Sequence, residues 1–352
     1  RLLRFIAEAV TLCQPASVAT KTDAEADYEY IRRRALETGE EMALRTPGHT
    51  VHFDGYHDQA RDRANTRYLV PPDDPLTGTD LNTIDRDEGL TEVKGYLRGS
   101  MRDRQMLVCF FALGPTDSFF TIPAVQVTDS YYVAHSDHLL YRPGYEQFRR
   151  LNGGDGFFRV LHSMGVLRDG VSAEVEHRRI YIDLAEETVY SVNTQYAGNT
   201  VGFKKLALRL AIRKADREGW LAEHMFIMGV HGPAGRTTYF TGAFPSFCGK
   251  TSTAMITGET IVGDDLAYLR KRSGLVRAAN VERGIFGIIR DVNPQDDPII
   301  WQAVTSPGEV IFSNVLVADG VPYWLGDGRP VPDRGINFSG EWYPGKTDAE
   351  GN

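Results

Sequence analysis

The sequence of 352 residues has only three cysteines and no continuous run of 18 apolar residues. Cys13, Cys109 and Cys248 are too few, and odd in number, for a disulfide framework, so we expect a reducing compartment such as the cytoplasm. The missing apolar run excludes a membrane-spanning helix. Basic residues are outnumbered, 39 Lys and Arg against 47 Asp and Glu, and a net charge of −8 gives no general attraction to nucleic acid or anionic membrane.

The composition is that of a folded chain with one large or two moderate domains. Hydrophobic residues make up 42% and charged residues 24%, as in ordinary globular proteins. Near the start, Leu2, Ile6 and Val10 recur at helical spacing and Glu8 interrupts them, which favours an amphipathic helix over a signal peptide. The sequence begins without Met and ends in a polar stretch, so we expect a piece of a longer protein.

The hydrophobic patterns predict an α/β fold. In the first half we predict a helix over 28–39, buried strands over 106–113 and 125–133, and a hairpin of 178–184 with 189–193. In the second half we predict helices over 203–218 and 250–255, and strands over 224–230, 237–244, 260–263 and 310–317. A glycine-punctuated segment near Tyr196 predicts a boundary between a domain 1–195 and a domain 196–352.

The segment from Thr241 to Thr251 has the ending of a phosphate-binding loop. It follows a predicted strand and opens a predicted helix, with Gly249, Lys250 and Thr251 at the junction. Free backbone N–H groups at such a helix start bind phosphate oxygens, the lysine neutralises the outer phosphates, and the threonine hydroxyl binds their metal ion. Phe244 stands where the usual motif has its first glycine. An ordinary strand–turn–helix with an exposed lysine therefore remains the alternative.

Acidic, basic and imidazole side chains near this loop could form a metal site. Asp264 and Asp265 end an apolar strand, where they suit a metal–nucleotide complex, although paired-acid turns are common. Lys204 and Lys205 open a helix, where they oppose its dipole and lower each other's pKa, or simply lie on the surface. His224 is either a hydrogen-bonded structural residue or, with Asp265, part of a nitrogen–oxygen site suited to manganese.

Arg61 and Cys248 are two further candidates. Arg61 lies among acidic residues, so it forms either a surface ion pair or a bidentate clamp for a substrate carboxylate. Cys248 precedes the helix start and lies close to Lys250, a position at which thiols are reactive. Phosphoryl transfer itself needs no thiol nucleophile.

Taken together, these residues resemble the GTP-dependent phosphoenolpyruvate carboxykinases. The segment Ala243-Phe-Pro-Ser-Phe-Cys-Gly-Lys-Thr251 is similar to the family's loop Pro-Ser-x-Cys-Gly-Lys-Thr, which also has Phe at the first glycine position. Further family motifs are similar to 198–205, 218–225 and 262–265, with smaller matches at 114–115, 128–130, 286–287 and around Arg61. The resemblance covers nearly the whole chain from about residue 45. It implies a mixed-sheet N-terminal domain followed by part of a P-loop nucleotide-binding domain.

The resemblance also implies a role for each candidate residue. The ligands of a catalytic Mn²⁺ would be Lys205, His224 and Asp265, and those of a nucleotide-bound Mg²⁺ would be Thr251 and Asp264. The residues around the substrate would be Arg61 on its carboxylate, Tyr196 beside it, Gly198 and Asn199 in the same segment, and Lys204 on substrate or phosphate. The residues around the nucleotide would be Ser246, Phe247, Cys248, Gly249 and Lys250 in the loop, and Phe286 lining the pocket. Cys248 matches the family's reactive thiol.

The implied reaction converts oxaloacetate and GTP to phosphoenolpyruvate, GDP and CO2, in gluconeogenesis or anaplerosis. The resemblance implies a cytoplasmic monomer with no nucleic-acid or membrane partner. It also implies that the aromatic cage for guanine and further catalytic arginines lie outside these residues. The sequence departs from the family at Ala197, at Phe247 and after Gly287, where it is closer to archaeal or actinobacterial members. Pyrophosphate or another phosphoryl donor, a non-catalytic nucleotide-binding fragment and a different phosphate-loop kinase remain alternatives.

Overall fold

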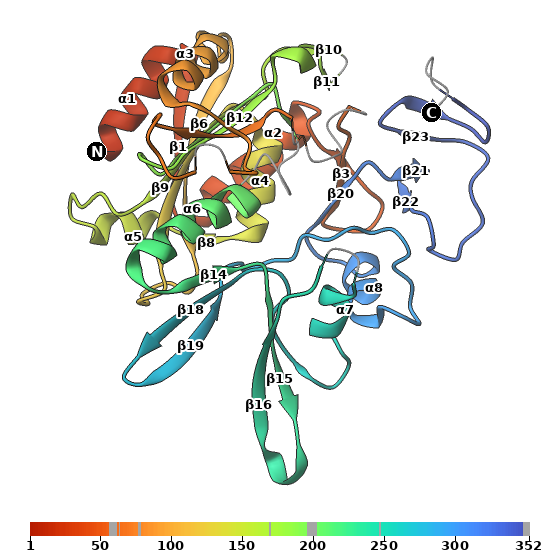
Figure 1. Ribbon diagram of the computed structural model, residues 1–352. Coiled ribbons are helices and arrows are strands. Elements are labelled where there is room, and N and C mark those ends of the chain that lie inside the picture. The colour runs from red at the N-terminus through yellow and green to blue at the C-terminus, as the bar shows by residue number, and fades with distance from the viewer. Residues whose placement is uncertain are drawn as a thin grey trace.

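The computed structural model describes residues 1–55, 62, 64–76, 79–168, 170–195, 203–245 and 248–347. In these residues the first half forms a nine-stranded mixed sheet with the order β1-β6-β7-β9-β13-β12-β4-β5, and β8 pairs with β6 (Figure 1). Its strands are β1 (Ser17–Lys21), β4 (Thr66–Val70), β5 (Thr83–Asp85), β6 (Gln105–Leu113), β7 (Ile122–Thr128), β8 (Arg142–Pro143), β9 (Phe158–Ser163), β12 (Arg179–Asp183) and β13 (Thr188–Val192). The α/β fold class is confirmed.

Helices cover both faces of this sheet. In β6, Cys109 and Phe111 belong to one buried cluster, and Val108 and Phe110 belong to another, because successive side chains of a strand point to opposite faces. The first cluster includes residues of α2 (Glu25–Glu37), α4 (Tyr131–Leu140) and α6 (Phe203–Glu218). The second includes residues of α1 (Leu2–Cys13), α3 (Arg86–Leu97) and α5 (Tyr145–Arg150). Burial on both faces explains why the sequence of β6 is continuously apolar.

The second half of the chain contains smaller sheets. One has the order β14-β18-β19, one β16-β15-β17, and one β22-β21-β23-β24. Their strands are β14 (Leu221–Glu223), β15 (Phe226–His231), β16 (Thr237–Gly242), β17 (Thr260–Gly263), β18 (Ala267–Arg272), β19 (Leu275–Asn280), β21 (Leu316–Ala318), β22 (Val321–Tyr323), β23 (Gly335–Asn337) and β24 (Gly340–Trp342). Besides α6, the α-helices in this part of the described chain are α7 (Lys250–Ala254) and α8 (Pro298–Thr305). Figure 1 shows the hairpins β15–β16 and β18–β19 projecting away from the large sheet.

Another sheet joins segments that are far apart in the sequence. Its order is β2 (Met42–Ala43), β3 (His49–His52) and β20 (Val310–Ser313), and β3 and β20 are parallel. Buried polar contacts hold it against α4: His135 Nδ1 lies 2.7 Å from Glu41 Oε1, and the ring of His52 stacks on Tyr132 at 3.5 Å. The first and second halves of the chain are therefore tied together at this sheet as well as at the site described below.

Most of the predicted elements are present, with two corrections. The helix 203–218 and the hairpin of β12 with β13 are confirmed. The strand predicted over 125–133 ends at Thr128, because the Ser130 hydroxyl accepts a hydrogen bond from Val133 N and caps α4. The strand predicted over 310–317 is divided into β20 and β21 at Asn314, whose φ of 57° interrupts the extended backbone.

The remaining features of the described chain are short. Residues 167–168 and 171–172 form a small hairpin, β10 (Leu167–Arg168) with β11 (Val171–Ser172), and the 3-10 turns are Val175–His177 and Pro233–Gly235. Every helix in the described ranges is too short or too polar to cross a membrane. The boundary predicted near Tyr196 falls within residues 196–202, which lie outside the described ranges.

Candidate functional site

Five candidate residues that the structure describes in the second half come together where four elements meet. Lys204 lies in the first turn of α6, and His224 lies between β14 and β15. Lys250 is the first residue of α7, and Asp264 and Asp265 directly follow β17. Because β15 is antiparallel to both β16 and β17, the loop that leaves β16 and the acids that follow β17 lie at the same end of this small sheet.

The strand, loop and helix predicted for phosphate binding are present. β16 ends at Gly242 and α7 begins at Lys250. Gly249 has a φ of 79°, a left-handed conformation that glycine adopts without steric cost, and it gives α7 no side-chain cap. The ring of Phe244 packs edge-on against Phe226 at 5.4 Å. That packing explains why a phenylalanine stands at the usual position of a glycine.

The phosphate-loop lysine and threonine contact the acid pair. Lys250 Nζ donates a hydrogen bond to the backbone oxygen of Asp264 at 2.6 Å and also contacts the carboxylate of Asp265. Thr251 Oγ1 donates to Asp264 Oδ2 at 3.1 Å. The loop and the two carboxylates, which the sequence only suggested as neighbours, therefore form one cluster.

Two of the implied ligands of a divalent metal, His224 and Asp265, contact each other beside this cluster. His224 Nε2 lies 2.5 Å from Asp265 Oδ1, and an imidazole nitrogen with a carboxylate oxygen suits a cation such as Mn²⁺. The third implied ligand is Lys205, whose side chain lies outside the described part of the structure. Within the described residues no group of three or more His, Cys, Asp or Glu side chains could hold a metal ion. The ligands implied for Mn²⁺ include only two side chains of these four types, His224 and Asp265, because the third ligand is a lysine.

The surrounding positive charges decide the ionisation of Asp265. Burial alone would raise its pKa, but the hydrogen bonds from His224 and Lys250 and the charge of Lys204 hold the pKa well below its usual range. Burial raises the pKa of Asp264 above its usual value, against the opposing effect of Lys204. Asp265 is therefore the carboxylate of this pair that stays ionised most readily.

Lys204 is buried at the base of the site, with 2% of its side chain exposed. Its Nζ lies 2.9 Å from Asp265 Oδ2 and 3.2 Å from Glu282 Oε1, and it donates to the backbone oxygen of Phe286 at 3.3 Å. Burial would lower the pKa of Lys204, but Glu282, Asp265 and Asp264 together raise it. This direction is opposite to the lowering expected from Lys205 as a neighbour.

Glu282 is a site residue that the sequence analysis missed. It follows β19, is 1% exposed, and reaches Lys204 across the fold. Burial raises the pKa of Glu282 to about 7, against the effect of Lys204. A single acidic residue after an exposed hairpin has no motif around it that indicates a functional role. Only its tertiary contact with Lys204 identifies it as a site residue.

Other predicted residues are placed in part. Phe286 is half-buried, and its ring centroid lies 5.6 Å from Lys204 Nζ, so it joins the cluster. Cys248 is an exposed free thiol beside Gly249. The predicted residues that lie outside the described ranges are Arg61, Tyr196, Gly198, Asn199, Ser246 and Phe247.

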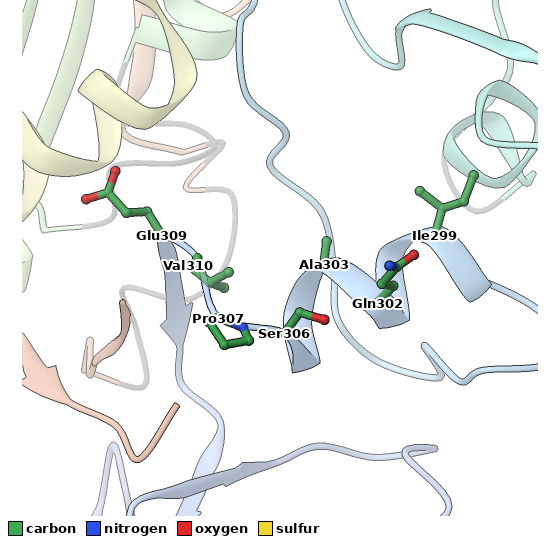
Figure 2. A pocket seen from close by; sticks show the side chains of 8 residues that line it. Ile299, Gln302, Ala303, Ser306, Pro307, Glu309 and Val310 are labelled. Atoms are coloured by element: carbon green, nitrogen blue, oxygen red, sulfur yellow. The ribbon is translucent and has the colours of Figure 1, made fainter. Parts of the chain in front are cut away.

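A groove of about 460 Å³ lies apart from the cluster, along α8 and the turn that leads into β20 (Figure 2). Glu309 is the charged residue of its lining, and Figure 2 shows that its carboxylate points away from α8. None of the candidate residues that the structure describes is among those lining this groove. The chemistry of the site is therefore carried by the cluster around Asp265.

Comparison with known proteins agrees with this geometry. Two family models match the chain: phosphoenolpyruvate carboxykinase N-terminal domain over residues 4–216, and phosphoenolpyruvate carboxykinase C-terminal P-loop domain over residues 220–352. Curated proteins named phosphoenolpyruvate carboxykinase (GTP) from Thermococcus kodakarensis, Saccharolobus solfataricus and Corynebacterium glutamicum are 58%, 51% and 33% identical to it. The alignments cover 100%, 97% and 97% of this chain. The chain spans 56%, 54% and 59% of the relatives' own lengths.

Proposed function

The chain belongs to the phosphoenolpyruvate carboxykinase family, and from this premise we propose that the whole protein converts oxaloacetate and GTP to phosphoenolpyruvate, GDP and CO2. The observation that carries the proposal is the contact of Lys250, in the phosphate loop, with Asp265, which is hydrogen-bonded to His224. In this proposal the lysine of the phosphate site and the histidine of the metal site contact the same carboxylate, that of Asp265. Decarboxylation and phosphoryl transfer in a single pocket require that proximity.

The metal ions of the proposed reaction would have distinct ligands. His224 and Asp265, with Lys205, would hold Mn²⁺, and Thr251 with Asp264 would serve the Mg²⁺ of the nucleotide. When bound, a divalent cation supplies Lewis-acid polarisation of the oxaloacetate carbonyl. The short contacts that His224 and Thr251 make with the two carboxylates support this division.

Lys250 changes partners during the proposed reaction. In the structure its ammonium group contacts Asp265, and its side chain is 9% exposed. When the nucleotide binds, the ammonium group exchanges the carboxylate for phosphate oxygens, where it neutralises charge on the transferred group. The same exchange releases an oxygen of Asp265 for the metal. Nucleotide binding and metal binding are therefore expected to favour each other.

The substrate side of the proposal rests on family membership. Arg61 fixes the substrate carboxylate, Tyr196, Gly198 and Asn199 line the substrate, and Ser246 to Thr251 hold the phosphates. Phe286 lines the pocket. Phosphoryl transfer passes directly between substrates, so Cys248 is not required as a nucleophile.

The setting of the reaction belongs to the same proposal. Residues 1–195 form the substrate-side domain, and residues 196–352 belong to the nucleotide- and metal-binding domain. The protein acts as a cytoplasmic monomer without a nucleic-acid or membrane partner. Three free cysteines support a reducing compartment.

A donor panel with the full-length protein tests this function. Purified protein is supplied with oxaloacetate, Mn²⁺ and Mg²⁺, and with GTP, ATP or pyrophosphate, and phosphoenolpyruvate is measured. GTP is expected to give the fastest formation, and omission of oxaloacetate is the control. Formation with pyrophosphate but not with GTP would overturn the GTP assignment, and no formation with any donor would overturn the reaction itself.

A further inference from the structure

Glu282 is a buried carboxylate at the site for which the proposed reaction has no use. Its side chain is 1% exposed, and its Oε1 lies 3.2 Å from Lys204 Nζ. Within the described residues neither carboxylate oxygen has a hydrogen-bond partner, and Lys204 is its one ion-pair partner. A buried carboxylate is costly unless it is paired, so its place here needs an explanation in terms of Lys204.

The backbone around Glu282 is fixed to the first half of the chain. The backbone oxygen of Val281 accepts hydrogen bonds from Gly114 N at 2.9 Å and from Arg142 Nη1 at 3.0 Å. On the other side, Arg283 N donates to the backbone oxygen of Leu140 at 2.7 Å. Glu282 is therefore held from both sides and provides a fixed position for its carboxylate.

Asp265, the second carboxylate on Lys204, has several competing partners. Its Oδ1 accepts hydrogen bonds from His224 at 2.5 Å and from Lys250, and its Oδ2 lies 2.9 Å from Lys204. A metal ion on this carboxylate takes oxygen lone pairs and neutralises its charge. Lys204 then keeps two of its contacts, with Glu282 and with the backbone oxygen of Phe286.

We propose that Glu282 is a positioning residue for Lys204: its carboxylate holds the buried ammonium group in place when a metal ion occupies Asp265. The inference rests on the proposed function for the identity of that metal site. An ammonium group has three N–H donors. One of these donors is used by the backbone oxygen of Phe286, and the ammonium charge is paired with Glu282. A further donor becomes available to substrate or phosphate once Asp265 binds the metal.

Chemical labelling of Lys204 in the full-length protein tests the inference directly. An amine-acylating reagent is applied with and without MnCl2, and the Lys204 peptide is quantified by mass spectrometry relative to the exposed Lys271. In the wild type, Lys204 is expected to stay protected under both conditions. In Glu282→Gln it is expected to stay protected without Mn²⁺ and to react about fivefold faster with it, because a buried ion pair has lost its remaining partner.

Two variants accompany this measurement. Glu282→Asp keeps the charge, and Lys204 is expected to remain protected with Mn²⁺, a result that is informative even if the glutamine variant does not fold. Glu41→Gln is the matched control, because Glu41 is also buried but contacts His135 and Thr50. It is expected to leave Lys204 protected. Equal labelling of Glu282→Gln with and without Mn²⁺, or loss of protection in Glu282→Asp, would overturn the inference.

A kinetic readout separates this inference from the proposed function. Glu282→Gln is expected to lower kcat by about tenfold, while the Kd for Mn²⁺, from direct titration of the protein, changes by less than about threefold, since a displaced group costs rate more than binding. An unchanged kcat overturns the positioning role. If the wild type forms no phosphoenolpyruvate but the labelling pattern holds, the proposed function fails and the role of Glu282 in holding Lys204 stands.

Discussion

Replacing Asp265 by Asn removes the negative charge on which three donors converge. His224 and Lys204 lie 2.5 and 2.9 Å from its two oxygens, and Lys250 contacts it as well. Lys204 is 2% exposed, so its ammonium group cannot exchange the lost partner for water. We therefore expect Asp265→Asn to be less stable than the wild type even without metal.

The expected loss follows from the contacts that remain. Removing one partner of a buried ion pair costs about 3–5 kcal/mol. Glu282 and the backbone oxygen of Phe286 still hold Lys204, at 3.2 and 3.3 Å, which places the expected loss at the lower end, about 3 kcal/mol. A metal ion at a thousand times its Kd stabilises the wild type by about 4 kcal/mol. The variant should gain almost none of this.

Denaturant unfolding of the full-length protein with and without MnCl2 measures both quantities. Asp183→Asn is the matched control, because Asp183 is fully buried and pairs with one cation, Arg86, at 2.8 Å in the first half. Asp183→Asn should lose a comparable amount of unfolding free energy. It should still be stabilised by Mn²⁺ as much as the wild type is. If Mn²⁺ stabilised Asp265→Asn as much as it stabilises the wild type, Asp265 would not be a metal ligand and the reasoning would be refuted.

Three further changes test other parts of the structure. Gly284→Ala places a Cβ 2.2 Å from the backbone oxygen of Leu139 and should lower the free energy of unfolding by about 2 kcal/mol, measured by denaturant titration; an unchanged value would contradict the close packing. The interaction with His135, whose Nε2 lies 4.0 Å from Oε1 of Glu309, lowers the pKa of Glu309 to about 2 from 4.5. The contribution of Glu309 to stability is therefore present above pH 4.5 and lost as the pH falls towards 2. Glu309→Gln should flatten this decline in thermal midpoints between pH 6 and 2, and an unchanged decline would be evidence against the pair. Thr251→Val removes the hydroxyl that lies 3.1 Å from Asp264 and should weaken binding of the magnesium nucleotide by about tenfold in titrations, whereas Thr251→Ser should not; equal affinities would contradict the assignment.

Local signals predicted the framework of the site. The strand, the loop and the helix that begins at Lys250 follow from a glycine at the helix start and from apolar segments on either side. Helix 203–218 follows from its periodicity. Local signals failed where a side chain changed the backbone, as at Ser130, whose hydroxyl begins a helix inside an apparently alternating segment.

Tertiary contacts supplied what the sequence could not show. The ion pair of Lys204 with Glu282 joins α6 to the segment after β19, and nothing near either residue indicates it. Phe244 departs from the usual glycine pattern because it packs on Phe226, a partner in another strand. The roles of Arg61 and Tyr196 come from the family resemblance and stay predictions.

Transfer of the terminal phosphate of GTP tests the central claim most directly. Full-length protein is incubated with oxaloacetate, Mn²⁺ and GTP labelled at the γ-phosphate, and the label is followed in the products. The wild type and Lys271→Ala, which changes an exposed lysine, should place the label in phosphoenolpyruvate, and Lys250→Ala should not. Label found only in inorganic phosphate, or phosphoenolpyruvate formed at the wild-type rate by Lys250→Ala, would contradict the account.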